Sequence, residues 1–96
     1  MNRAYGARKR VQGHYYAVSW ESGSPSALHV AAPKAVFARA VDRNREKRRV
    51  RALFRTPSLS GGIWMVRVLR SSAGVSFSEL KTEVAALVEC IKRDIR

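Results

Sequence analysis

The sequence has few of the residues on which secreted, membrane-spanning or independently catalytic proteins depend. Cys90 is the single cysteine among 96 residues, which excludes an intramolecular disulfide and a cysteine-based zinc site and favours a reducing, cytoplasmic location. Only 7 residues are acidic, and they are scattered, so the clustered carboxylates of a two-metal nuclease are missing. No signal-peptide pattern opens the chain, and no apolar run is long enough to cross a membrane.

The scarcity of acids leaves a strongly positive chain. Against the 7 acids stand 19 Lys and Arg, a formal net charge of +12, and such a charge costs self-repulsion unless a polyanion relieves it. Nucleic acid is the expected partner, because neutralising phosphates releases counterions. A membrane surface is the competing polyanion, but the basic segment lacks the Trp, Phe and Leu face of an interfacial helix, so no membrane partner is expected. The apolar content of 46% suffices for one modest core.

Composition divides the chain into a short arm and one domain. Residues 1–10 are polar and basic and are expected to form an N-terminal arm that is mobile without RNA, while residues 11–96 form the domain. Alternating β-formers from Val11 to Trp20 predict a strand. A second strand is predicted from Ala27 to Ala32, after a turn rich in Ser, Gly and Pro. We expect the two strands to pair as a hairpin.

The second half of the sequence predicts a helix, a strand and a helix. Phe37 to Arg55 contains no Gly or Pro and is rich in Arg and Ala, which favours a helix. Ile63 to Leu69 is nearly all apolar, the pattern of a strand covered on both faces. Ser76 and Glu79 have capping-box spacing, and apolar residues then recur at helical intervals: Leu80, Val84, Leu87, Val88, Ile91 and Ile95. The order strand, strand, helix, strand, helix predicts an α+β fold, a two-layer sandwich.

The first predicted helix separates its charges. At about 100° per residue, its cations share one side with an asparagine: Arg43, Asn44, Lys47, Arg48, Arg51 and Arg55. The opposite side carries Asp42, Glu46, Val50 and Leu53. Like charges four residues apart repel each other without a partner, and arginine suits phosphate oxygens and base edges better than lysine does. This side of the helix is therefore a candidate RNA-binding surface, although a solvated charged face is the alternative.

The run from Ala40 to Arg55 resembles the signature helix of the bacterial ribonuclease P protein component. An Ala-Val pair precedes an Arg-Asn-Arg motif, followed by Lys-Arg, a further Arg and a closing Phe-Arg. The resemblance covers most of the chain from Gly6 to Ile95, but only this helix is specific. It identifies these residues as candidates for binding RNA: Arg43, Asn44, Arg45, Lys47, Arg48, Arg51 and Arg55.

The resemblance implies a fold, a function and a set of partners. The fold is that of the ribosomal protein S5 domain 2-like group, with a left-handed crossover between two parallel strands. The chain would be the protein subunit of ribonuclease P, binding the catalytic RNA while a cleft on its sheet receives the 5′ leader of precursor tRNA. The holoenzyme is an endoribonuclease whose RNA, with bound Mg²⁺, performs the cleavage. The protein itself would supply no catalytic residue, bind no cofactor or metal alone, and take no small-molecule substrate.

The sequence also departs from the family pattern. The family begins with a further helix and strand whose aromatic residues help to form the leader cleft, so this N-terminus is abbreviated and half of the cleft is expected to be missing. Glu46 and Arg49 stand where the family tends to have aliphatic residues. Both residues lie on the side of the helix that is turned away from the basic residues. Our hypothesis is that this side became polar because the part of the protein that packs on it was lost. Lys34 stands alone where the family often has two lysines, and Gly61 and Gly62 replace an acidic residue, so no protein-bound metal is expected.

A few further residues complete the candidate site. Tyr15 and Lys34 are possible contacts for the substrate leader, since an aromatic on a strand can stack on an unpaired nucleotide. Tyr16, Trp20 and Trp64 are predicted to lie in the core because their same-face neighbours are apolar. His14 and His29 are predicted to lie on the surface of the sheet rather than to bind a metal. The alternative function is a structural RNA-binding protein of the ribosomal kind, without a role in tRNA processing.

Overall fold

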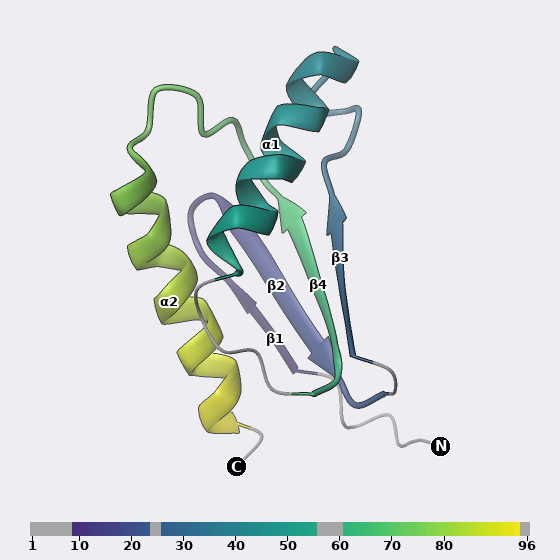
Figure 1. Ribbon diagram of the computed structural model, residues 1–96, viewed down its shortest axis with the longest axis vertical. Coiled ribbons are helices and arrows are strands. Elements are labelled where there is room, and N and C mark those ends of the chain that lie inside the picture. Colours follow the sequence, from purple (N-terminus) through teal and green to yellow (C-terminus); the bar gives the residue numbers. More distant parts are fainter. Residues whose placement is uncertain (1–8, 24–25, 56–60, 95–96) are drawn as a thin grey trace.

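The computed structural model describes residues 9–23, 26–55 and 61–94. Within these ranges the chain forms a four-stranded sheet with two helices packed on one face (Figure 1), which confirms the predicted α+β sandwich. In chain order the elements are β1 (Lys9–Gln12), β2 (Tyr16–Glu21), β3 (Ala27–Ala31), α1 (Ala40–Leu53), β4 (Ile63–Val68) and α2 (Phe77–Asp94). The described part of the chain contains no helix that is both long and apolar enough to span a membrane.

The sheet does not contain the predicted hairpin between the second and third strands. Its strand order is β1-β2-β4-β3, so β4 lies between β2 and β3. Val66 of β4 is opposite Val18 of β2 in an antiparallel pair and opposite Val30 of β3 in a parallel pair. The prediction was wrong because a parallel pair needs a crossover segment, and α1 provides it.

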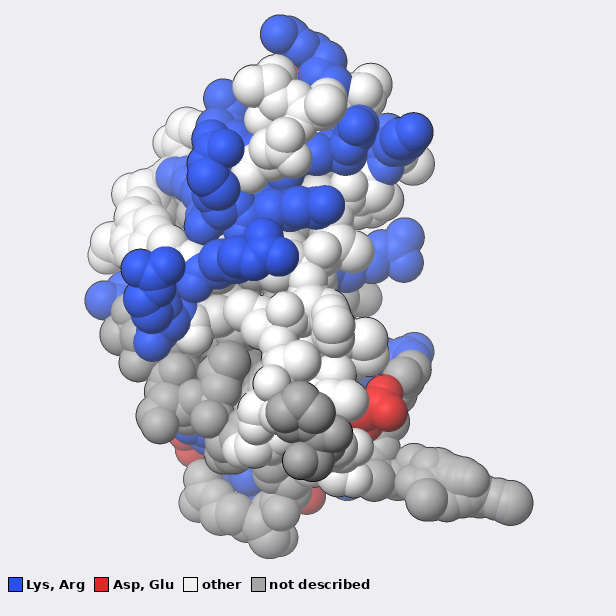
Figure 2. Space-filling view, turned by 45° about the vertical axis from the view of Figure 1, so that its right-hand side comes forward, with Lys and Arg blue, Asp and Glu red and all other residues white. Residues whose placement is uncertain are grey.

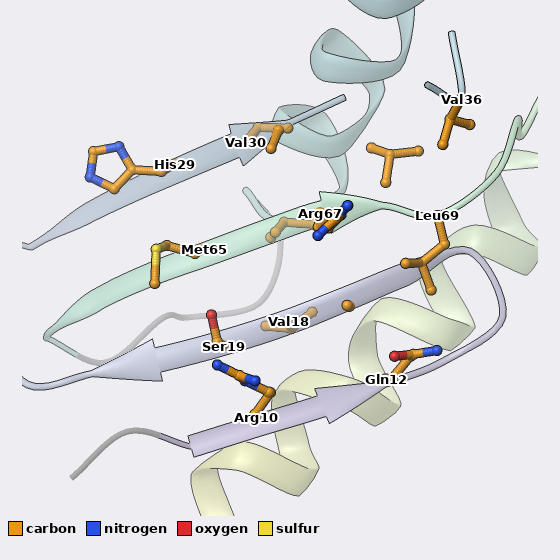
Figure 3. A pocket seen from close by; sticks show the side chains of 14 residues that line it. Arg10, Gln12, Val18, Ser19, His29, Val30, Val36, Met65, Arg67 and Leu69 are labelled. Atoms are coloured by element: carbon orange, nitrogen blue, oxygen red, sulfur yellow. The ribbon is translucent and has the colours of Figure 1, made fainter. Parts of the chain in front are cut away.

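The crossover from β3 through α1 to β4 is left-handed. Figure 1 shows α1 in front of the sheet, with β3 and β4 both pointing upward and β4 to the left of β3. Figure 3 views the sheet from the opposite face, with the helices behind it, and gives the same hand. This arrangement agrees with the resemblance and is the reverse of the usual right-handed rule.

The predicted strand from Val11 to Trp20 is two strands joined by a tight turn. The Gly13 N–H donates to the Tyr16 carbonyl at 2.8 Å, which closes the turn between β1 and β2. A side chain at Gly13 would place its Cβ 2.8 Å from Glu83 Oε2, so the Glu83 carboxylate would have to move. The element order therefore has one strand more than predicted, and Lys9 and Arg10 belong to β1 rather than to an arm. Residues 1–8 of that arm lie outside the described residues.

The core lies between one face of the sheet and the two helices. Tyr16 and Trp64 are buried there, as predicted, and Trp20 is half-buried at its margin, where its Nε1 donates to the Gly61 carbonyl at 3.0 Å. Ser76 caps the start of α2, because the Glu79 N–H donates to Ser76 Oγ at 3.1 Å, which is one of the two hydrogen bonds of a capping box. The predicted apolar face of α2 is buried: Leu80, Val84, Leu87, Val88 and Ile91. Ile95 lies outside the described residues.

The second face of the sheet is open, contrary to the prediction for β4. Trp64, Val66 and Val68 are buried, but Arg67 is exposed and Met65 is only half-buried. The apolar composition of this strand was therefore not a sign of two covered faces. Because both helices pack on the other side, this open face can receive another molecule.

Candidate nucleic-acid interface

Helix α1 turns one side to the core and the other to solvent. Val50 and Leu53 are buried, as the helical periodicity predicts, and Glu46 on the same side is buried too. The exposed side carries Asn44, Arg45, Arg48 and Arg51, and Arg55 is exposed in the turn that follows the helix; we call these five residues the basic face. In Figure 2 the Lys and Arg side chains gather over the upper part of the molecule, where α1 lies, and almost no acidic side chain interrupts them.

Two of the predicted RNA-binding residues, Arg45 and Lys47, adjoin an acid or the core. Arg45 Nη2 lies 3.0 Å from Asp42 Oδ1, and the two side chains are 51% and 31% exposed. A solvent-exposed pair of this kind contributes little to stability, so Arg45 can exchange Asp42 for a phosphate at low cost. Lys47 is half-buried at the margin of the basic face, and its flexible stem allows the ammonium group to reach solvent.

Arg43 differs from the rest of the predicted set. Its side chain is half-buried, and its Nη1 donates to the carbonyls of Phe37 and Ala38 at 2.9 and 3.1 Å. Asn44 follows it in the sequence and is exposed. The Arg-Asn-Arg motif therefore spans two environments, because helical geometry turns consecutive side chains by about 100°.

A buried polar cluster joins α1 to the loop before α2. Glu46 is fully buried, and its two carboxylate oxygens accept hydrogen bonds from Ser72 Oγ at 2.7 Å and from the Ser72 N–H at 3.1 Å. Arg49 donates to the Ser72 carbonyl at 2.6 Å, to Ser72 Oγ at 2.9 Å and to the Val75 carbonyl at 2.9 Å. The hypothesis of a lost packing partner is therefore wrong. The face is polar because it packs on a polar loop whose buried groups it satisfies.

Tyr16 lies beside this polar cluster. Burial raises the pKa of Tyr16 to about 12, and the carboxylate of Glu46 acts in the same direction, while the Ser72 hydroxyl and Arg49 oppose it. The Tyr16 hydroxyl is buried without a hydrogen-bond partner among the described residues. This phenol is thus kept neutral in a dry environment and is a structural group, far from the open face of the sheet.

The open face of the sheet is hollowed into a groove of about 610 Å³. Strand register arranges its floor in two rows that cross all four strands. One row is Arg10, Ser19, Met65 and His29, and the other is Gln12, Ala17, Arg67 and Ala31. Figure 3 shows these side chains standing on the sheet, with Val36 and Leu69 at one end of the groove. Hydrogen-bonded strands are about 4.8 Å apart, so the rows extend for about 14 Å.

The chemistry of this groove suits an extended anionic chain. Arg10 and Arg67 are exposed cations on different strands, and the floor between them is formed by the small side chains of Ala17 and Ser19. Small residues allow planar groups to approach the sheet closely, while guanidinium groups can bind phosphate oxygens in a bidentate manner. The floor of the groove crosses all four strands, which favours an extended ligand over a compact one.

The sequence missed most of the residues that line this groove. Arg10 was placed in the arm, and Met65 and Arg67 were placed in a doubly covered strand. His29 is exposed on β3, as predicted for the sheet surface, whereas His14 lies in the turn between β1 and β2. The charged residue at position 67 of an otherwise apolar strand was the signal that one face of β4 is open.

The two predicted leader contacts differ in their relation to the groove. Tyr15 lies in the turn before β2 and not on a strand; it packs against the core, and its N–H donates to Glu83 Oε2 at 2.8 Å. Its ring contacts His14 edge to face, with centroids 4.6 Å apart. Lys34 is exposed in the turn after β3, two residues before Val36 at the end of the groove. Only Lys34 is thus near the groove.

The described residues contain no group of three His, Cys, Asp or Glu side chains that could hold a metal ion. The buried carboxylate of Glu46 is committed to hydrogen bonds with Ser72 in the core.

Comparisons with known proteins agree with this geometry. A family model described as Ribonuclease P matches residues 2–92. The RNase P protein from Thermotoga maritima has a similar structure, with a TM-score of 0.73 and 22% identity, covering 88% of this chain and 84% of that one. The RNase P protein of Staphylococcus aureus has a TM-score of 0.73 and 16% identity, covering 92% and 84%. At these identities the solved structures show a shared fold. No match was found among curated proteins.

Proposed function

Because the chain belongs to the Ribonuclease P family, we propose that it is the protein subunit of a ribonuclease P holoenzyme that removes the 5′ leader from precursor tRNA. In this proposal the protein binds two RNAs, the catalytic ribonuclease P RNA and the precursor tRNA, and acts in the cytoplasm. The observation that carries the proposal is the presence of two separate surfaces suited to RNA. The basic face of α1 is on one side of the sheet, and the groove is on the other.

The basic face is the proposed site for the catalytic RNA. Arg48 and Arg51 on α1 and Arg55 just after it are exposed, and their guanidinium groups can each bind two phosphate oxygens or a base edge. Asn44 can donate to and accept from a base, and Arg45 and Lys47 extend the surface on either side. Binding relieves the repulsion among these cations and releases counterions from the RNA.

The groove is the proposed site for the leader. Arg10 and Arg67 would hold the backbone of an unpaired strand, while its bases lie on the small residues between them. Lys34 would add a charge beside the end of the groove. Tyr15 is not proposed as a leader contact, since it packs against the core at the turn before β2.

The proposed role in catalysis is binding and orientation. The seven acids of the chain are scattered, and the described residues offer no metal-ligand cluster, so no step of the reaction is assigned to a side chain of this protein. The magnesium that the reaction needs would be bound by the RNA. Holding the leader against the sheet while α1 binds the catalytic RNA would fix the cleavage site relative to the RNA active centre.

The test is cleavage of a precursor tRNA by the source organism's ribonuclease P RNA at low Mg²⁺, with and without the protein. We expect strong stimulation by the wild-type chain. The variant Arg45→Glu with Arg48→Glu should not bind the RNA or stimulate cleavage, although its fold is intact, because both side chains are exposed. Lys81→Glu with Arg93→Glu is the matched control, since it changes the net charge equally on exposed positions of α2.

The same experiment distinguishes the proposed function from the alternative, a structural RNA-binding protein of the ribosomal kind. Binding to ribosomal RNA with no preference for ribonuclease P RNA, and no stimulation of cleavage, would favour a structural protein of the ribosomal kind. Equal loss of RNA binding in the double variant of α1 and in the control on α2 would show that only net charge matters. The basic face would then not be a specific binding site for the catalytic RNA.

A further inference from the structure

Arg43 stabilises a turn that connects the groove to α1. The turn begins at Pro33, whose carbonyl accepts hydrogen bonds from the Val36 and Phe37 N–H groups, both at 3.0 Å. At the end of the turn, the carbonyls of Phe37 and Ala38 accept from Arg43 Nη1. One guanidinium nitrogen therefore holds the last part of the turn against the first turn of α1.

The two side chains in the middle of this turn face different environments. Phe37 is 5% exposed and is part of the core, whereas Val36 is 41% exposed and lines one end of the groove. Figure 3 places Val36 close to the end of the groove at which Leu69 lies. The position of Val36 therefore depends on the backbone of a short segment, which Phe37 fixes by packing and Arg43 by hydrogen bonding.

The carbonyl groups of this segment have few other ways to be held. They precede α1, and the first amides of the helix, those of Asp42 and Arg43, donate to the Arg39 carbonyl instead. Without Arg43, water would have to solvate both oxygens. A guanidinium group is suited to bridging them, because it presents several N–H donors in one rigid plane.

We propose that Arg43 is a positioning residue for the substrate groove rather than a contact of the basic face. By holding the carbonyls of Phe37 and Ala38, it keeps Val36 and the exposed Lys34 at the end of the groove, where a leader nucleotide would lie. This inference rests on the proposed function of the groove. It also separates the roles within the Arg-Asn-Arg motif, since Asn44 and Arg45 face the catalytic RNA.

The first experiment tests the turn itself in the free, full-length protein. Amide hydrogen exchange at Val36 and Phe37 should be about tenfold faster in Arg43→Ala than in the wild type, because the segment that holds these amides loses two hydrogen bonds. Arg51→Ala, an exposed position on the same helix, should leave both amides unchanged. Arg43→Lys should be intermediate, since an ammonium group lacks the planar donors. Unchanged exchange in Arg43→Ala would overturn the inference.

The second experiment uses the reconstituted holoenzyme with two precursor tRNAs, one with a long leader and one with a single-nucleotide leader. For Arg43→Ala we expect KM to rise about fivefold for the long leader alone, with kcat unchanged and affinity for the catalytic RNA within about twofold of wild type. Arg51→Ala should weaken binding of the catalytic RNA whichever substrate is present. Loss of RNA affinity in Arg43→Ala as large as that in Arg51→Ala would also overturn the inference.

The two experiments distinguish failure of this inference from failure of the proposed function. If wild-type protein treats the two substrates alike, the groove is not a leader site, and the role of Arg43 at that site is overturned with it. The exchange measurement would still show whether Arg43 holds the turn. If the wild type discriminates between the leaders and Arg43→Ala discriminates equally well, only the role of Arg43 is overturned.

Discussion

Replacement of Glu46 by leucine tests the buried polar cluster directly. Leucine cannot accept the hydrogen bonds from the Ser72 N–H and Oγ, and Ser72 is fully buried, so water cannot replace the lost acceptor. An unsatisfied buried N–H costs about 1–3 kcal/mol, and the hydroxyl loses a hydrogen bond to a charged acceptor, worth about 1.5–3 kcal/mol. Arg49 keeps its carbonyl partners but loses a nearby negative charge.

Leucine offsets part of this loss through apolar burial, worth about 1.5–3 kcal/mol. We therefore expect the free energy of unfolding of Glu46→Leu to be about 2–3 kcal/mol lower than that of the wild type. For a domain of this size that corresponds to a fall in Tm of about 10–20 °C. Urea unfolding followed by circular dichroism and by tryptophan fluorescence measures the change.

Two further variants make the result specific. Glu79→Gln is the control, because Glu79 is exposed and its substitution should change stability by less than about 0.5 kcal/mol. A double-mutant cycle of Glu46→Leu with Ser72→Ala should give a coupling energy of at least about 1 kcal/mol, since the two side chains are in contact. If Glu46→Leu is as stable as the wild type or more stable, the cluster is dispensable, as replacement of buried ionic groups by apolar ones sometimes shows. Our reasoning would then be refuted.

Three other predictions concern Tyr16, Gly62 and the basic face. Since burial raises the pKa of Tyr16 from 10.0 to about 12, the folded protein keeps a proton that the unfolded chain loses, and the free energy of unfolding should fall by up to about 2 kcal/mol between pH 10 and 12. In Tyr16→Phe this contribution should be missing, so urea titrations at pH 10 and pH 12 should show a smaller fall in the free energy of unfolding than in the wild type. An equal fall in both proteins would contradict the raised pKa of Tyr16. Gly62→Ala should be destabilising by about 2 kcal/mol or more in thermal unfolding, because Gly62 has a φ of 121° and an added Cβ would meet the Trp20 indole; an unchanged Tm would show that this contact relaxes freely. Arg51→Ala should reduce the slope of log affinity for RNA against log salt by about 1, and an unchanged slope would exclude Arg51 as a phosphate contact.

The features that the sequence predicted well are those set by local periodicity. The apolar face of α2, the burial of Val50 and Leu53 and the exposure of Arg48 follow from helical spacing alone. The hydrogen bond from the Glu79 N–H to Ser76 Oγ at the start of α2 is equally local. Fold class follows from the order of such elements, and the specific Arg-Asn-Arg helix identified the family.

The features that were missed depend on which segments meet in space. Nothing in the residues from Ala27 to Ala31 indicates that their neighbour is β4 rather than β2, because strand pairing is decided by burial across the whole sheet. Alternation continues through the turn at Gly13, which hid the boundary between β1 and β2. The helical wheel showed which way Arg43 and Glu46 point, but it could not show the carbonyls and the serine that they bind.

The insertion of β4 between β2 and β3 also determines when the protein can fold during synthesis. Until Ile63–Val68 has left the ribosome, β3 has no partner strand, and β1 with β2 is the one pair of strands that can form by local contacts. The basic helix is therefore made before the strand that completes the sheet. Because pairing across so long a separation is slow, the newly made chain exposes its cationic segment before its core has closed. RNA that binds α1 at that stage would meet a partly folded protein and could favour completion of the sheet.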